Sequence, residues 1–444
     1  MNTPICDFVK GYAEQNKIRL HMPGHKGTGF LGCEALDITE VSGADSLYEA
    51  SGIIAESEAN ASALFGTDTF YSTEGSSHAI RAMLCLCLAD AKQQGRRPVI
   101  LAGRNAHKAF VSAAALLDFD VQWIYPNGCD SYLACTITAQ KAECMLSQMS
   151  TPPAAIYITS PDYLGNMADI KALVEVCHRY GTLLAVDNAH GAYLKFLSPS
   201  QHPMDMGADI CCDSAHKTLP VLTGGAYLHI SHNLPHLCNM AKNALALFGS
   251  TSPSYLILQS LDRANKIISE GYGNRLSELV LKVNQTKQAL AEGGYTFIGN
   301  EPMKITIDAK AYGYSGTALA KALSQQGIEC EFADPDYFVL MPSADTNETH
   351  LDLLKSALLN IPKAEPILTF APDFFTPQRV MSIREATLSP SEILPLSQCE
   401  GRVLSQATVA CPPAVPILVS GEVIDQNAIK RFEYYGIDNL TVVK

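Results

Sequence analysis

Short apolar segments alternate with amphipathic ones through most of the first 230 residues, and this alternation constrains the fold more than any other feature. Residues 98–102 and 154–159 are apolar runs of strand length, each followed by a polar turn. Residues 168–180, before the next such run, carry apolar side chains at helical spacing. The pattern predicts a mainly parallel sheet that is covered by helices on both faces. In sheets of this kind, ligands bind at the carboxyl ends of the strands.

Two further strand-like runs end in residues that suit a pyridoxal phosphate (PLP) site. The first, residues 182–191, delivers Asp187. The second, residues 209–218, delivers Lys217. A lysine amine forms a Schiff base with the PLP aldehyde, and a carboxylate keeps the pyridine nitrogen protonated, so that the ring can act as an electron sink. Lys217 alone would be read as a solvated surface lysine, but its pairing with Asp187 favours the PLP site.

Two other stretches suit the remaining parts of such a cofactor. Residues 75–77 form a Gly-Ser-Ser turn before a predicted helix at 79–91, where backbone N–H groups and the helix dipole favour a phosphate. The alternative for this turn is an ordinary serine N-cap. His107 follows the strand at 98–102 and could stack on a flat ring, although a capping or core histidine is the alternative.

Composition excludes several classes of protein. The 444 residues are 47% hydrophobic and 17% charged, which argues for a globular chain and against disorder. The net charge of −13, without a long basic run, argues against a nucleic-acid partner. The 14 cysteines form no Cys-x-x-Cys pair, so we expect buried thiols in a reducing, cytoplasmic compartment and no metal site. No apolar run approaches the roughly 20 residues of a membrane span, and the N-terminus has no signal pattern.

The chain divides into four predicted parts. Residues 1–50 show little periodicity and are expected to form an irregular arm. Residues 51–292 form the large PLP-binding domain, and residues 293–362 form a small α/β domain. Residues 363–444 are a proline-rich C-terminal extension, in which a helix is expected at residues 389–396.

With these residues laid out, the chain resembles the Orn/Lys/Arg decarboxylase family, in a short form that lacks the N-terminal wing domain. The resemblance spans almost the whole chain, and the order and spacing of its motifs together are specific. The motifs are residues 21–27 (HMPGHKG), 75–77 (GSS), 104–108 (RNAHK), 159–165 (TSPDYLG), 187–191 (DNAHG), 214–217 (SAHK) and 412–422 (PPAVPILVSGE). The resemblance implies a fold-type-I PLP enzyme, similar to aspartate aminotransferase, with a smaller C-terminal α/β domain.

The resemblance also implies a role for the matching positions. Lys217 would form the Schiff base with PLP, and Asp187 would pair with the pyridine nitrogen. His107 would stack on one face of the ring, and Ala189 would pack on the other. The implied cofactor contacts further include His190 and, around the phosphate, Gly75, Ser76, Ser77, Ser214 and His216.

Two motifs depart from the family pattern. The usual Asn-Gly before the phosphate turn is Glu74-Gly75 here, and a carboxylate so close to a phosphate is expected to point away. The usual Tyr-Pro-Pro-Gly-Ile-Pro is CPPAVP at residues 411–416. These changes leave the cofactor residues intact and affect the expected substrate pocket.

The function that the resemblance implies is decarboxylation of a basic L-amino acid (arginine, lysine or ornithine) to its amine and CO2. The enzyme would then return a proton to Cα, with Lys217 or His216 as the acid. An aminotransferase or aldolase-type lyase on the same fold is an alternative, because a fold alone does not fix the chemistry. A non-catalytic PLP-binding regulator is the second alternative, and the retention of Lys217, Asp187 and His107 argues against it.

A cationic substrate needs a carboxylate that meets its distal charge. The candidates are Glu331, Asp334 and Asp336, which cluster before a predicted strand, and Asp45 in the arm. For any one of them the alternative is a solvated turn. Relatives with this fold build their sites at subunit interfaces, so the resemblance also implies a homodimer or a higher homo-oligomer, with the arm reaching a neighbour.

Overall fold

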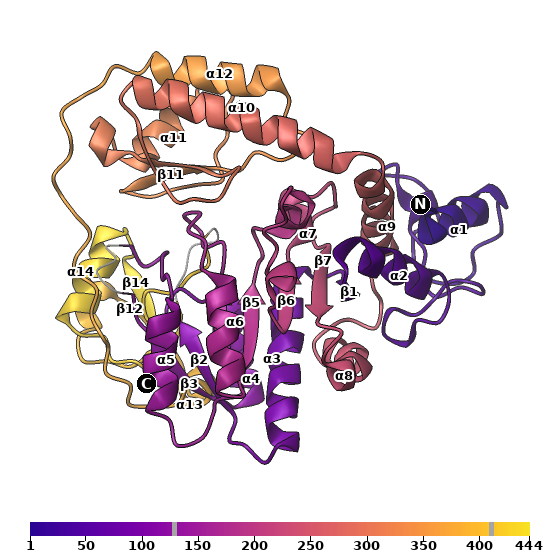
Figure 1. The fold of residues 1–444 in the computed structure, drawn as a ribbon, viewed down its shortest axis with the longest axis horizontal. Coiled ribbons are helices and arrows are strands. Elements are labelled where there is room, and N and C mark those ends of the chain that lie inside the picture. The colour runs from indigo at the N-terminus through magenta and orange to yellow at the C-terminus, as the bar shows by residue number, and fades with distance from the viewer. Residues whose placement is uncertain (127–130, 408–412) are drawn as a thin grey trace.

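The structure is a computed structural model that describes residues 1–126, 131–407 and 413–444 (Figure 1). It contains three sheets, of seven, four and three strands. They fall in order within the three predicted segments after the arm. Cys411 and Pro412, which begin the proline-rich motif, lie outside the described residues.

The seven-stranded sheet has the order β1-β7-β6-β5-β4-β2-β3. Strand β7 pairs antiparallel with β6 and β1, and the remaining pairs are parallel, so the predicted mainly parallel sheet is confirmed. Its strands are β1 (Asp68–Ser72), β2 (Val99–Gly103), β3 (Asp120–Ile124), β4 (Ala155–Thr159), β5 (Leu183–Asp187), β6 (Ile210–Asp213) and β7 (Ala226–Ile230).

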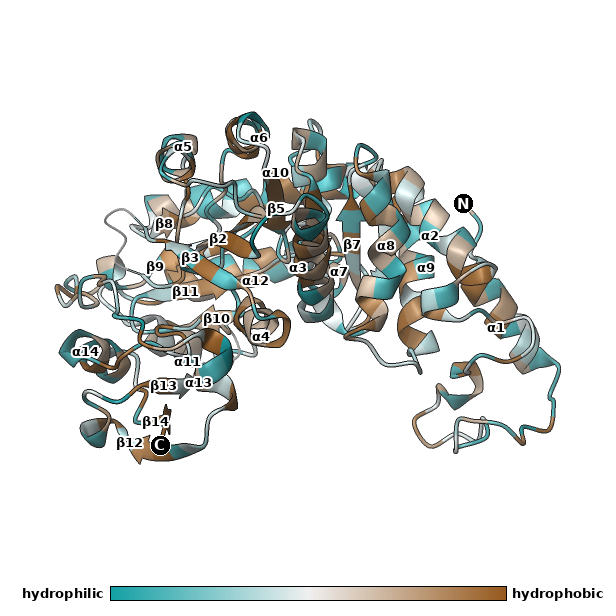
Figure 2. Cartoon of the chain, turned by 90° about the horizontal axis from the view of Figure 1, so that it is seen from below, coloured by the Kyte–Doolittle hydropathy of each residue, from teal (hydrophilic) through white to brown (hydrophobic). Residues whose placement is uncertain are grey.

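Helices cover both faces of this sheet, as the alternation predicts. They are α3 (Gly75–Gln93) and α4 (Lys108–Leu117) on one face, and α5 (Ala139–Ser147) and α6 (Ile170–Arg179) on the other. Successive residues of a strand alternate between two cores: Ile100 packs with α3 and α4, whereas Leu101 packs with α5 and α6. Figure 2 shows the hydrophobic strands β2 and β5 inside these helices, whose outer surfaces carry hydrophilic residues.

A predominantly helical segment links the large sheet to the small one. It consists of α7 (Ala215–Thr218), α8 (Pro235–Ala246), α9 (Tyr255–Ser269) and α10 (Tyr272–Glu292). The four-stranded sheet follows with β8 (Thr296–Ile298), β9 (Ile305–Asp308), α11 (Gly316–Ser324), β10 (Phe332–Ala333), β11 (Tyr337–Leu340) and α12 (Glu348–Leu359). Helix α12 packs on α10 above this sheet (Figure 1).

The C-terminal segment contains a three-stranded sheet where a helix was expected at residues 389–396. Its elements are α13 (Ile383–Leu388), β12 (Ser391–Pro395), β13 (Leu404–Gln406), α14 (Gln426–Tyr434) and β14 (Asn439–Val443). The prediction was wrong because Pro395 lacks the backbone N–H that the last turn of such a helix would need, and α13 already ends at Leu388. The residues beyond it pair with β14 instead.

The N-terminal arm begins with a helix, so the expectation of an irregular arm is wrong for its first third. Helix α1 (Pro4–Glu14) buries Ile5, Val9 and Tyr12 at helical spacing and packs on α9 and α2 (Ile53–Phe65). The rest of the arm has only short 3₁₀ turns within its described residues, at Glu34–Leu36 and Leu47–Glu49. Figure 2 shows this part extending away from the body of the protein.

Two further properties bear on where the chain works. Within the described ranges, no helix is both long enough and apolar enough to cross a bilayer. The cysteines that the structure describes are free thiols.

Candidate active site

A cavity of about 350 Å³ lies at the carboxyl ends of the parallel strands. Seven of the residues that the sequence singles out line it: Ser76, His107, Asp187, Ala189, His190, Lys217 and Glu331. Seven others complete its wall: Asn105, Thr159, Pro161, Tyr163, Pro413, Ala414 and Val415. The second group belongs to motifs noted in the sequence, but nothing local in those motifs assigned it a role. Residues 413–415 bring the C-terminal extension to the cavity.

Asp187 ends strand β5 and is buried. Its carboxylate accepts hydrogen bonds from the Tyr157 hydroxyl at 2.8 Å and the Ala189 amide at 3.2 Å. Burial raises the pKa of this carboxyl, and the Tyr157 bond and the charge of Lys217 oppose the rise. A buried carboxylate whose close donors are neutral suits a cationic group placed in the cavity.

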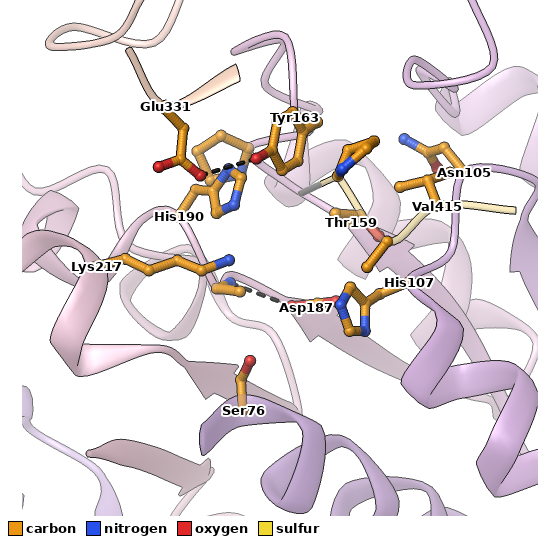
Figure 3. Close-up of a pocket in the computed structure, with 14 residues that line it drawn as sticks. Ser76, Asn105, His107, Thr159, Tyr163, Asp187, His190, Lys217, Glu331 and Val415 are labelled. Atoms are coloured by element: carbon orange, nitrogen blue, oxygen red, sulfur yellow. Dashed lines mark hydrogen bonds between the residues drawn. The ribbon is translucent and has the colours of Figure 1, made fainter. Parts of the chain in front are cut away.

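Lys217 approaches the same space from the neighbouring strand. It lies in the short helix α7 after β6. Figure 3 shows its side chain extending into the cavity between His190 and Asp187, with Ser76 below. Its charge contributes to lowering the pKa values of His107 and His190, after the larger effect of burial. The amine is therefore close enough to both histidines for its charge to act on them.

His107 caps a helix, which is one of the alternatives that its sequence position left open. It is the N-cap of α4, because Nδ1 accepts a hydrogen bond from the Ala109 amide at 3.1 Å. Its ring also lines the cavity. Burial, with the charges of Lys217 and Lys108, lowers the pKa of His107 to about 3, so the imidazole is neutral at physiological pH. A neutral ring fixed in this way can lie flat against an aromatic ligand.

The candidate phosphate residues are only partly gathered at the cavity. Ser214 Oγ donates to Ser76 Oγ at 2.6 Å, so these two hydroxyls meet at the start of α3. Gly75 has a φ of +73°, a conformation that favours glycine, and its amide donates to the Gly224 carbonyl. Ser77 lines a neighbouring cavity, and His216 Nδ1 bonds the Gly225 carbonyl at 3.0 Å.

Glu74 points away from the phosphate turn, as the sequence led us to expect. Its carboxylate accepts a hydrogen bond from the Ser250 amide at 2.6 Å. The acid therefore does not face an anion bound at Ser76.

A contact that the sequence did not predict holds His190. Lys304 Nζ lies 2.7 Å from His190 Nδ1 and donates to the carbonyls of Asp162 and Tyr163, each at 3.2 Å. Burial lowers the pKa of this lysine to about 8. Lys304 is 114 residues from His190 in sequence, and its flanking residues carry no motif that could have revealed the contact.

The four candidate acids for the substrate's charge are placed differently. Glu331 lines the cavity and accepts a hydrogen bond from the Tyr163 hydroxyl at 2.8 Å (Figure 3). Asp334 lies outside it and accepts the backbone amides of two following residues. Asp336 pairs with Lys310 at 2.8 Å. The structure thus brings one of these acids to the cavity.

Asp45, the fourth candidate, serves the backbone of the arm. Its carboxylate accepts the amides of Ser51, Gly52 and Ile54 at the start of α2. The arrangement is that of a helix-capping acid.

Among the described residues, one group has the spacing of a metal site: His202, Cys211 and Asp213. Both carboxylate oxygens of Asp213 are already hydrogen-bonded, to His202 and His229 on one side and to Asn188 on the other. These contacts make the cluster part of a buried hydrogen-bond network.

The residues around the cavity fit PLP. A buried carboxylate for the pyridine nitrogen ends β5, and a lysine amine for the aldehyde lies in the short helix after the adjacent strand β6. A neutral histidine lines the wall, and two hydroxyls meet at the start of a helix of 19 residues, where a phosphate is favoured. The donor types therefore match each part of the cofactor.

Known proteins resemble the chain over most of its length. Residues 3–306 match the major domain of Orn/Lys/Arg decarboxylases, and residues 374–438 match their C-terminal domain. The arginine decarboxylase of Bacillus subtilis (strain 168) is 30% identical over 465 residues, which cover 96% of this chain and 92% of that protein.

Solved structures show the same fold. The lysine decarboxylase of Francisella novicida superimposes with a TM-score of 0.81 at 17% identity, over 100% of this chain and 81% of that one. An alanine–glyoxylate aminotransferase from Nostoc sp. superimposes with a TM-score of 0.56 at 18% identity, over 69% and 86%. The predicted fold type I is confirmed by these likenesses.

Proposed function

The chain belongs to the Orn/Lys/Arg decarboxylase family, and from that premise we propose that it removes CO2 from a basic L-amino acid with PLP held at Lys217. The observation that carries the proposal is one cavity in which Lys217 and Asp187 meet an acid, Glu331, from the small sheet's segment. The first two suit the cofactor, and the third suits a cationic substrate.

Each residue of the cavity has a distinct proposed role. Bound PLP supplies an electron sink for the pair of electrons that the departing carboxylate leaves behind. Asp187 would hold the proton on the pyridine nitrogen, while His107 and Ala189 would bound the two faces of the ring. Ser76 and Ser214 would bind the phosphate at the start of α3.

For the return of a proton to Cα, the geometry favours Lys217 over His216. Lys217 lines the cavity, so Nζ can reach a substrate there. His216 is absent from the cavity lining of the described chain, and its Nδ1 is engaged with the Gly225 carbonyl. We propose Lys217 Nζ as the proton donor.

Glu331 is the proposed partner of the substrate's distal charge, and arginine is our first choice of substrate because the curated relative is named an arginine decarboxylase. Glu331→Gln should raise KM for the cationic substrate, since a guanidinium or ammonium would lose its counter-charge. Glu329→Gln is the control, because Glu329 is exposed and bonds Ser324.

A panel of L-amino acids, with the amine products identified by mass spectrometry, tests the whole proposal. We expect amine and CO2 from at least one basic amino acid and poor turnover of norleucine. Equal turnover of norleucine would exclude recognition of a distal charge. A 2-oxo acid product would favour the aminotransferase alternative, for which the likeness to the Nostoc enzyme is the supporting observation.

We also propose a cytoplasmic homodimer. The arm exposes apolar side chains that a partner could cover: Ile18 (87%), Leu20 (90%), Phe30 (77%) and Leu31 (76%). The described cysteines are free thiols, in keeping with a reducing compartment. Sedimentation at working concentration tests the dimer, and an active monomer would contradict it.

A further inference from the structure

A second cavity, of about 540 Å³, adjoins the active-site cavity. It lies between the residues around strand β10, the loop after residue 412, and the end of helix α14. The two cavities share three wall residues: Glu331, Pro413 and Val415. Figure 1 shows the small sheet above the large sheet and α14 to the left of it. A ligand in the second cavity would therefore contact the wall of the first.

The second cavity has the chemistry of a site for an organic cation. Glu331, Asp334 and Glu433 contribute carboxylates, and no lysine, arginine or histidine occurs among the described residues that line it. Four aromatic side chains complete much of the wall: Tyr132, Phe332, Tyr434 and Tyr435. Aromatic faces and carboxylates both attract ammonium and guanidinium groups.

Two buried polar atoms in this wall lack partners. Asp334 is only 6% exposed, and its Oδ1 accepts the amides of Asp336 and Tyr337. Its Oδ2 has no hydrogen-bond partner within the described part of the chain, and neither has the buried Tyr435 hydroxyl. Buried polar atoms are seldom left unpaired, so these two point to a missing donor.

Asp336, two residues from Asp334, is an acid whose charge is paired within the protein. Its carboxylate pairs with Lys310 at 2.8 Å. Asp334 forms no ion pair with any described residue. Burial raises its pKa to about 6, although the charge of Lys310 acts against that rise. The contrast separates a structural ion pair from an acid that still has an open acceptor.

We propose that the second cavity binds an ammonium or guanidinium group, with Asp334 and Glu433 as its charge partners and Tyr435 as a hydrogen-bonding partner. The group has two possible sources: the distal end of a long substrate that reaches past Glu331, or a free amine such as the product. Both sources assume the proposed decarboxylation, so the choice between them rests on the proposed function. The binding of a cation in this cavity does not depend on it.

The test is calorimetric titration of the full chain with cadaverine and with agmatine, the amine derived from arginine. The neutral control ligand is 1,5-pentanediol, which has the length of cadaverine without its charges. We expect binding of at least one amine and none of the diol. Asp334→Asn and Glu433→Gln should each weaken amine binding at least tenfold, and Glu329→Gln should leave it unchanged.

Asp334→Asn is a conservative probe, because Asn retains the Oδ1 acceptor for both backbone amides. Its thermal unfolding should match that of the wild type, so a change in binding would not reflect misfolding. If Asp334→Asn and Glu433→Gln bind the amines and turn over substrate as the wild type does, or if the diol binds equally, the proposal is overturned.

Lys217→Ala distinguishes the two sources. Amine binding that persists in this variant identifies a free-amine site. Loss of that binding, together with a KM raised at least tenfold by Asp334→Asn in the otherwise intact chain, identifies the substrate's distal end. Amine binding without decarboxylation of any amino acid would refute the proposed function and leave this site standing.

Discussion

Two aspartates end neighbouring strands of the large sheet, and their surroundings differ. Asp187 on β5 and Asp213 on β6 are both buried. Burial alone would raise the pKa of Asp213, but the charges of and bonds from His202 and His229 hold it below its usual value. Burial raises the pKa of Asp187, whose close hydrogen-bond donors are neutral.

The difference separates a structural carboxylate from one that is open to a ligand. Asp213 has its donors within the protein, since His202, His229 and Asn188 saturate both of its oxygens. Asp187 borders the cavity, where a cationic ring nitrogen would complete its pairing. Adjacent residues on one sheet edge thus serve folding in one case and the proposed chemistry in the other.

The largest expected effect is the loss of turnover when Lys217, which shares the cavity with Asp187, is replaced. Lys217→Ala should abolish turnover, because no other amine would hold the cofactor's aldehyde, and its circular dichroism should match that of the wild type. In the wild type, borohydride reduction should attach the cofactor to the peptide that contains Lys217. A label on Lys108 would show that the cavity has been assigned to the wrong lysine.

The next largest effect is expected at Asp187. Asp187→Asn keeps the shape but removes the charge that holds the proton on the ring nitrogen, so kcat should fall on the order of 10³-fold, or about 4 kcal/mol. Urea unfolding of the cofactor-free protein should change by less than about 1 kcal/mol, since the donors to Asp187 are few and neutral. If Asp187→Asn kept nearly full activity, the charge of Asp187 would not have the catalytic role that distinguishes it here from Asp213.

At Asp213 the expected loss is in stability. Asp213→Asn should lower the free energy of unfolding by about 2–4 kcal/mol, because two buried histidines lose a shared acceptor. Since the folded pKa is depressed, this contribution is present above the unfolded value of about 4 and is lost as pH falls through the folded pKa. Urea titrations should give a difference from the wild type that is present at neutral pH and shrinks in strong acid.

The kinetics of the same variant provide the check. Active molecules of Asp213→Asn, counted by cofactor content, should retain wild-type kcat within a few-fold. Loss of kcat at unchanged stability would mean that the two aspartates do not divide the roles as described.

The smallest effect is expected at Tyr157, which donates to Asp187 Oδ2 at 2.8 Å. Tyr157→Phe removes a bond that favours the ionised carboxylate, so the pKa of Asp187 should rise and the acid limb of the kcat–pH profile should move to higher pH. The loss in kcat should be about tenfold or less, in line with one hydrogen bond of ~1 kcal/mol. Tyr227→Phe is the matched control, because the buried Tyr227 hydroxyl has no partner within the described chain; an equal shift there would argue against a specific bond.

Local patterns predicted the secondary structure where one pattern dominated. The apolar run at residues 154–159 is strand β4, and the helical spacing at residues 168–180 corresponds to helix α6. The predictions failed where two signals competed. Proline and glycine signals in residues 1–50 outweighed the short amphipathic run of α1. Residues 391–395, expected in a helix, pair with β14 as strand β12.

The sequence by itself determined the chemistry available at the sheet edge. Lys217 and Asp187 follow adjacent apolar strands, and parallel strands bring their carboxyl ends to one edge, so their proximity follows from local pattern and a general rule of topology. The motifs around them, and their order along the whole chain, indicate the Orn/Lys/Arg decarboxylase family from the sequence alone.

Only the tertiary structure decided which acids line the cavity at that edge and which make structural contacts elsewhere. Glu331 reaches the cavity, whereas Asp45 caps a helix and Asp336 pairs with Lys310, although all three are the same kind of signal in the sequence. A carboxylate's role depends on the donors that surround it. Those of Asp45 lie within ten residues, but the partners of Asp336 and Glu331, Lys310 and Tyr163, lie tens of positions or more away. Contacts over such separations leave no periodicity in the chain, so they are fixed by packing and cannot be read from local pattern.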